Sequence, residues 1–122
     1  MIGGLSMKVE LTRYRVKAGK TSKVKEWMDF LNEHIEDVLV TLEGEKMFVE
    51  TIFREHLNGE EYLYWYSVQG NGGLDVDDST QWIDKKHLDY SDECIDESFG
   101  SIDLNTEVVM IPKKVRASMN CL

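Results

Sequence analysis

The chain has 122 residues, of which 42% are hydrophobic and 30% charged, and its formal net charge is −9. This length and composition fit one soluble globular domain. The acidic balance repels phosphate backbones and anionic lipids, and no apolar run approaches the roughly 20 residues that span a bilayer. Nucleic acid and membrane are therefore not expected partners.

An alternating run begins at Met7, so Met1–Ser6 are expected to be an N-terminal extension or a cloning remnant. The domain itself is predicted over residues 7–113, followed by a C-terminal tail over 114–122. The N-terminus is too short and too weakly apolar for a signal peptide. Two widely spaced cysteines, Cys94 and Cys121, are then expected to be reduced thiols in the cytoplasm.

Strand formers alternate over Lys8–Val16, which predicts the first strand. Apolar side chains then recur at helical spacing, which predicts one helix from about Ser22 to Leu42 that ends near Gly44. Asn58–Gly59 accept the positive φ angles of a type I′ turn. They therefore predict a hairpin whose two antiparallel strands are Met47–His56 and Glu61–Gln69.

Gly70–Gly73 form a predicted loop, and Ser79 is the expected cap of a second helix that ends near Phe99 and Gly100. The segment Asn105–Val115 is predicted as a final strand, stopped near Pro112. This order of elements predicts an α+β fold, a ferredoxin-like βαββαβ sandwich. Its antiparallel four-stranded sheet carries two helices on one face.

Both faces of this predicted sheet carry large apolar groups. In the segment Glu60–Gly70, one face holds Trp65 with Leu63 and Ser67, and the other holds Tyr62, Tyr64, Tyr66 and Val68. We expect the tyrosines on a packed face. In the last predicted strand, Val108 and Met110 oppose Val109 and Ile111. An uncovered apolar face marks an interface or a ligand site, so a homodimer formed through the sheet face is predicted.

Three segments carry a resemblance to a known superfamily, namely "MKVELTRYRVKAGK", "WMDFLNEHIEDVLVTLEGEKMFVETIF" and "YLYWYSVQG". They resemble the dimeric α/β-barrel superfamily, and within it a bacterial family of uncharacterised proteins, from Met7 to about Met119. The chain is more distantly similar to antibiotic-biosynthesis-type monooxygenases. The resemblance implies the ferredoxin-like fold and the dimer, and it implies no activity.

Monooxygenases of that superfamily that need no cofactor place aromatic and polar side chains in a cavity between sheet and helices. The candidate pocket residues here are Trp65, Tyr64, Tyr66, His87, Tyr90, Asn32, Glu50 and Arg54. The alternative is that the tyrosines serve the core and find hydrogen-bond partners there. For Glu10, Glu50, Arg54 and Glu107 the alternative is a salt-bridged lining.

Other motifs are incomplete. Haem-degrading relatives combine a strand asparagine, a strand tryptophan and a helix histidine; Trp65 and His87 match two of these, but Thr12 or Arg13 replaces the asparagine. His34 with Asp37, and Asp84 with His87, each offer only two metal ligands. The acidic segment from Asp75 lacks the glycine and glutamate of a calcium loop. No metal or cofactor is predicted.

The leading hypothesis is a small-ligand-binding or stress-related accessory protein without recognisable catalytic residues. The alternative is a cofactor-independent monooxygenase that acts on an aromatic substrate through Trp65 and His87. A third hypothesis is an interaction module whose function is the dimer face alone. The roles of His34, His87 and Cys94 stay open at this point.

Overall fold

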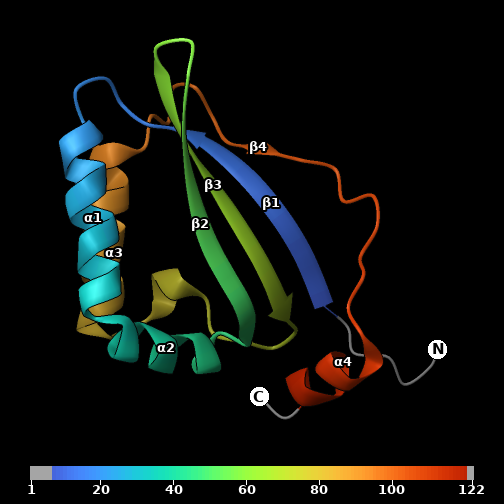
Figure 1. Cartoon of the computed structure of the whole chain (residues 1–122). Coiled ribbons are helices and arrows are strands. Elements are labelled where there is room, and N and C mark those ends of the chain that lie inside the picture. Colours follow the sequence, from blue (N-terminus) through green and yellow to red (C-terminus); the bar gives the residue numbers. More distant parts are fainter. Residues whose placement is uncertain (1–6, 121–122) are drawn as a thin grey trace.

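The computed structural model describes residues 7–120, and the predictions for Met1–Ser6 and Cys121 lie outside the described residues. The chain is α+β with a four-stranded antiparallel sheet. Figure 1 shows the elements, which are β1 (Met7–Arg15), α1 (Thr21–Glu33), α2 (Ile35–Gly44), β2 (Met47–Leu57), β3 (Glu60–Gly70), the 3₁₀ turn η1 (Val76–Asp78), α3 (Trp82–Cys94), β4 (Ile102–Asp103) and α4 (Lys113–Met119).

The sheet has the strand order β2-β3-β1-β4, so β3 and β1 are its central strands. The predicted hairpin is confirmed: β2 pairs with β3 from Leu57↔Glu60 onward, and Asn58 and Gly59 have φ angles of 52° and 80°. This turn can be predicted from local sequence because few residue types accept two successive positive φ angles. β1 pairs along its whole length with β3, so the centre of the sheet is continuous.

The helices α1 and α3 lie side by side on one face of the sheet, and α2 runs across the end of this pair (Figure 1). The prediction of one helix over Ser22–Leu42 is wrong, because the chain leaves helical geometry at His34, where φ is −109° and ψ is 28°. Its backbone N–H still closes α1 on Phe30, and its carbonyl accepts the first bond of α2 from Val38. The turn lets α2 cover a part of the sheet that a straight helix would have passed by.

The second predicted helix is shorter than expected. Asp75–Ser79 form the turn η1 and its flanks, and the Ser79 hydroxyl accepts a hydrogen bond from the Gln81 N–H, while the helix itself begins at Trp82. It ends at Cys94 because Ile95 is extended and forms an isolated bridge with Val16. Of the helices in residues 7–120, none is long and apolar enough to cross a membrane.

The final predicted strand over Asn105–Val115 is wrong. The fourth strand is the two-residue β4, which pairs with Thr12 and Arg13 of β1. The following segment runs beside β1 toward α4 (Figure 1), and its side chains at Val108 and Met110 are 69% and 84% exposed. Alternation of apolar residues is present there, but no strand among the described residues pairs with it. The predicted tail from residue 114 lies mostly in α4, which follows Pro112.

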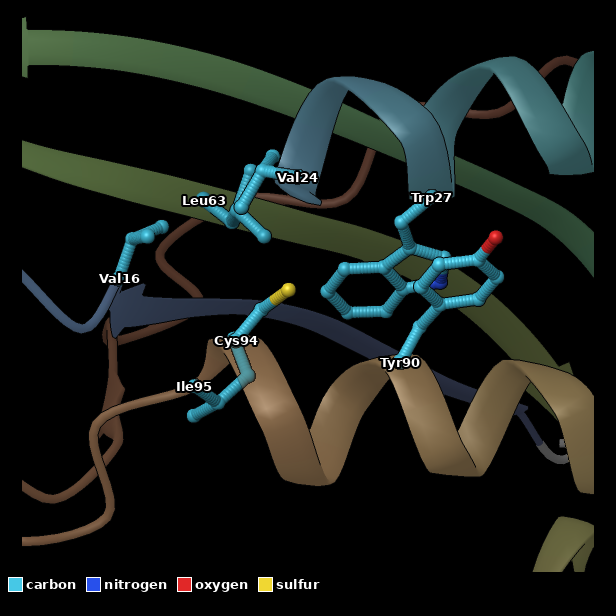
Figure 2. Close-up of a cluster of buried hydrophobic side chains, with 7 residues drawn as sticks. All are labelled: Val16, Val24, Trp27, Leu63, Tyr90, Cys94 and Ile95. Carbon is cyan, nitrogen blue, oxygen red and sulfur yellow. The ribbon is translucent and has the colours of Figure 1, made fainter. Parts of the chain in front are cut away.

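The buried core lies between α1, α3 and one face of the sheet. Figure 2 shows its members, with the rings of Trp27 and Tyr90 stacked and the Cys94 thiol beside Val24 and Leu63. The helices therefore cover the face of β3 that carries Leu63, Trp65 and Ser67. The prediction that the tyrosines occupy the packed face is wrong: Tyr62, Tyr64 and Tyr66 are half-buried on the face away from the helices, and only Val68 beyond them is fully buried.

Candidate functional site

A cavity of about 720 Å³ lies between the helix-covered face of the sheet and the helices α1, α2 and α3. It adjoins the buried core, with which it shares Ile95, and α2 forms one of its walls. Most of its apolar lining is aliphatic, supplied by Met28, Leu31, Ile35, Val38, Leu39, Leu42, Met47, Ile52, Leu74, Val76, Ile83 and Ile95. This volume is in the range of small-molecule sites in proteins.

The polar lining of the cavity is acidic. Five carboxylates contribute to it, from Glu10, Glu45, Glu50, Asp75 and Asp84, and within residues 7–120 no lysine or arginine does. Five acids without a cation in one concave site create a negative potential that the apolar walls screen poorly.

Glu50 of β2 is held by Trp65 of β3. The indole Nε1–H donates to Glu50 Oε2 over 2.7 Å, because the two side chains extend from paired strands on the same face. Burial raises the Glu50 pKa, and the bond from Trp65 partly offsets this by stabilising the carboxylate. This hydrogen bond thus holds a polar group in a defined position where the sheet lines the cavity.

Glu45 and Asp84 are more deeply buried, at 8% and 7% exposure. In the part of the chain that the structure describes, neither carboxylate has a hydrogen-bond or ion-pair partner, and their oxygens are open to the cavity rather than fully enclosed. The Glu45 pKa is raised from 4.5 to about 7, mainly by desolvation and then by the charges of Asp84, Glu50 and Asp75 in that order. The charge of Asp84 acts on Glu45, so the two side chains are neighbours at the cavity wall.

Glu45 is fixed by the backbone around it. It follows the end of α2, where the Leu74 N–H donates to the Gly44 carbonyl over 2.9 Å and the Gln69 side chain donates to the Glu45 carbonyl. Gly73 passes so close that a Cβ atom there would lie 2.0 Å from the Glu45 carbonyl oxygen. Only glycine allows this approach, so the loop holds Glu45 at the cavity wall.

His87 of α3 stands at the border between the core and the cavity. Trp27 Nε1–H donates to His87 Nδ1 over 3.0 Å, so the neutral imidazole carries its proton on Nε2. Burial lowers the His87 pKa, and the nearby Asp84 acts in the opposite direction. At neutral pH the ring is an uncharged group with an N–H donor to offer.

The structure brings four of the predicted pocket residues together and separates the other four. Trp65, His87, Asn32 and Glu50 all line the cavity. Tyr64 and Tyr66 lie on the opposite face of the sheet. Tyr90 packs in the core and donates through its hydroxyl to Glu26, and Arg54 binds Glu61 and the Thr21 carbonyl at the far end of the sheet.

Sequence reasoning missed Glu45 as a site residue and considered Asp84 only as half of a metal pair. Of the histidine, cysteine, aspartate and glutamate side chains in residues 7–120, no group of three is placed to hold a metal ion. The strand charges divide in the same way: Glu10 and Glu50 line the cavity, while Arg54 and the exposed Glu107 do not. Chemically the site offers several carboxylates, one neutral imidazole and a large apolar wall.

Comparison with known proteins adds a family and no activity. Neither the curated proteins nor the solved structures include a match to this chain. A model of a family of unknown function, DUF6176, matches residues 7–117. This match covers nearly the whole domain, and the chain therefore belongs to the DUF6176 family.

Proposed function

We propose that this protein binds a small molecule in the cavity between the sheet, α2 and α3. The observation that carries the proposal is a space of about 720 Å³ in which two buried carboxylates, Glu45 and Asp84, have no partner among the described residues. Buried charge without a partner is destabilising, and such groups are retained where a ligand satisfies them. Apolar walls with a few polar points are the usual composition of a ligand site.

A pair of tryptophan substitutions on α2 tests this function. Val38 lines the cavity, whereas Val40 on the same helix is 65% exposed and does not. A thermal-shift screen of metabolites on the unmodified chain should find a stabilising ligand, and Val38→Trp should abolish that shift by filling the space. Val40→Trp should leave it unchanged. A screen without any stabilising compound would count against ligand binding.

In this proposal the domain is ferredoxin-like and works as a homodimer in the cytoplasm. The strand order, taken from β4, is β4-β1-β3-β2, which is the order of a split βαβ sheet and supports the fold. Phe53 is 54% exposed on the sheet face opposite the helices, beside Tyr64, and this apolar face supports the dimer. The buried free thiol of Cys94 is consistent with a reducing compartment.

Light scattering of the full chain tests the assembly. The expected mass is that of two chains at micromolar concentration, and Phe53→Glu should shift it to one chain. Lys114→Glu, on the exposed side of α4, is the matched control that should leave the dimer intact. A monomer for the unmodified chain would remove the dimer from this proposal and leave the ligand site untouched.

The second candidate is a cofactor-independent monooxygenase for an aromatic substrate. The observation that favours it is that the ring centroids of Trp65 and His87 lie 5.6 Å apart and both side chains line the cavity. Oxygen uptake with quinol-type substrates is the test. Activity that depends on both Trp65 and His87, measured with Trp65→Phe and His87→Ala, would support it. No uptake, or uptake that survives both substitutions, would exclude this mechanism.

A further inference from the structure

We infer that the ligand of the cavity is an organic cation, a molecule with an ammonium or guanidinium group on an apolar body. This inference rests on the proposed function, whose ligand class it names. It starts from a contrast between three buried carboxylates. Glu61 is 6% exposed, a degree of burial close to that of Glu45 and Asp84.

Glu61 is fully paired within the chain. Arg54 donates to its Oε2 atom, and the Thr21 hydroxyl donates to Oε1 over 2.8 Å. Burial of a carboxylate is tolerated there because a cation and a hydroxyl replace its water. Within residues 7–120 no side chain supplies either group to Glu45 or Asp84, although they are buried to a similar extent.

The missing positive charge does not come from the rest of the cavity wall. Among the described residues that line it, the only basic side chain is His87, whose Nδ1 accepts the bond from Trp27 and whose burial favours the neutral ring. The other nearby acids, Glu50, Asp75 and Glu10, add negative charge. A cationic group on a ligand would supply what Arg54 supplies to Glu61.

A metal ion fits this site less well than an organic cation. In residues 7–120 no three ligating side chains are suitably placed for a metal. The aliphatic side chains of α2, such as Ile35, Val38 and Leu42, line a space that a metal ion alone would leave unfilled. An ammonium head near Glu45 and Asp84 with an apolar body against α2 would satisfy both parts.

Three probes of nearly equal shape test the inference on the full chain: phenylbutylamine, phenylbutanol and phenylbutyrate. Titration calorimetry should show that the amine binds at least about tenfold more tightly than the alcohol. The reason is that a charge-assisted hydrogen bond in a buried site contributes enough binding free energy for this difference or more. The carboxylate should bind weakest, since it meets five acids. This ranking uses the unmodified protein and does not depend on any variant.

Variants then locate the charge. Glu45→Gln and Asp84→Asn should each weaken the amine by about tenfold and leave the alcohol nearly unchanged. The matched controls are Glu43→Gln, on α2 just before Glu45, and Asp89→Asn, on α3 with Asp84; both are exposed acids that do not line the cavity. Equal loss in the controls would show a general charge effect and would overturn the assignment.

The outcomes separate the two proposals. If the alcohol or the carboxylate binds as tightly as the amine, and Val38→Trp blocks it, the ligand site stands and the cation inference is wrong. If the metabolite screen finds only neutral or anionic ligands that Val38→Trp excludes, the ligand site again stands and the cation inference is again wrong. If none of the probes binds and the screen is also empty, the proposed function and this inference fall together.

Discussion

The helix-covered face of the sheet has two ends, and they differ in what fills them. At one end α1 and α3 pack on β1 and β3, and Val24, Leu63 and Cys94 are fully buried (Figure 2). At the other end the chain turns at His34, and the cavity lies between α2, α3 and the sheet. The sheet and the helices therefore enclose a core beside α1 and a cavity beyond His34, where the first helix ends.

Trp27 and Trp65 form the boundary between these two regions. Their ring centroids are 5.7 Å apart, and each also contacts the His87 ring. Trp27 belongs to the core and reaches His87 through its N–H, whereas Trp65 borders the cavity and reaches Glu50. Each indole has an apolar body on the dry side and a polar contact toward the site, so both regions depend on this pair.

The largest expected effect comes from breaking the boundary. Trp27→Ala removes a fully buried ring together with the donor to His87, and it should lower the free energy of unfolding by about 3–5 kcal/mol in urea titrations. Trp82→Ala is the control: this ring is 52% exposed, and the expected loss is about 1 kcal/mol or less. Equal losses would show that the core does not depend on Trp27.

The next effect tests the backbone that holds the cavity wall. Gly73→Ala places a Cβ atom against the Glu45 carbonyl and should cost about 1–3 kcal/mol, because loop or helix end must move. Gly44→Ala is the matched control beside the same residue. Its Cβ meets nothing within 4 Å, and alanine is the better helix former, so stability should stay equal or rise. If both substitutions changed the free energy of unfolding equally, the close approach of Gly73 to Glu45 would not explain the loss.

A smaller effect of opposite sign should come from the buried acid. As pH rises from 4.5 to about 7, the unfolded chain releases the Glu45 proton while the folded chain retains it, so stability falls over this window. Glu45→Gln removes this loss and should stabilise the protein at about pH 8 by about 1–2 kcal/mol, the full shift being reduced by residual hydration. Stability profiles of both proteins from about pH 4 to pH 8 measure it.

The charged groups that act on Glu45 are Asp84, Glu50 and Asp75, and Glu10 and the neutral His87 line the same cavity. His87 contributes the opposite slope, because its lowered pKa removes stability as pH falls below about 6.5. Subtracting the profile of Glu45→Gln from that of the unmodified chain isolates the Glu45 contribution. A profile that is unchanged by the substitution would contradict an unpartnered buried Glu45.

The smallest effect lies outside both regions. The Ser98 hydroxyl and then Arg15 lower the Asp96 pKa to about 2. Its stabilisation is present above pH 3.8 and is lost as pH falls toward about 2. Asp96→Asn should therefore flatten only the acid limb of the stability profile and should leave ligand binding unchanged. If this substitution changed the affinity of the amine probe, the Asp96 region would contribute to the cavity, contrary to this prediction.

Elements with local causes could be predicted from the sequence, and elements with distant causes could not. Asn58–Gly59 define the hairpin by their own φ preferences. The apolar stripe runs through His34 without interruption, so the helix break depends on packing that periodicity cannot show. The alternating segment at Val108–Ile111 has strand chemistry but no partner strand, which only the fold reveals.

The candidate site followed the same division. Trp65 and Glu50 could be found because strand alternation places them on one face, and His87 lies on the inward side of its helix. Glu45 lies at a helix end, where an acid is ordinarily solvated, and only the approach of Gly73 and the burial of its side chain mark it. The tyrosines were misplaced because β propensity does not tell which face a helix covers.

The helix α2 has ten residues and, unlike α1 and α3, no buried side chain. A helix shorter than about 12–15 residues is marginal alone in water, so its hydrogen bonds persist only while its apolar side rests against the cavity. In deuterated solvent its amides should therefore exchange through local opening, well before those of β3, which is bonded on both sides. The wall that shapes the cavity is thus the first part of the layer to open, and occupancy would be recorded as slowed exchange in α2.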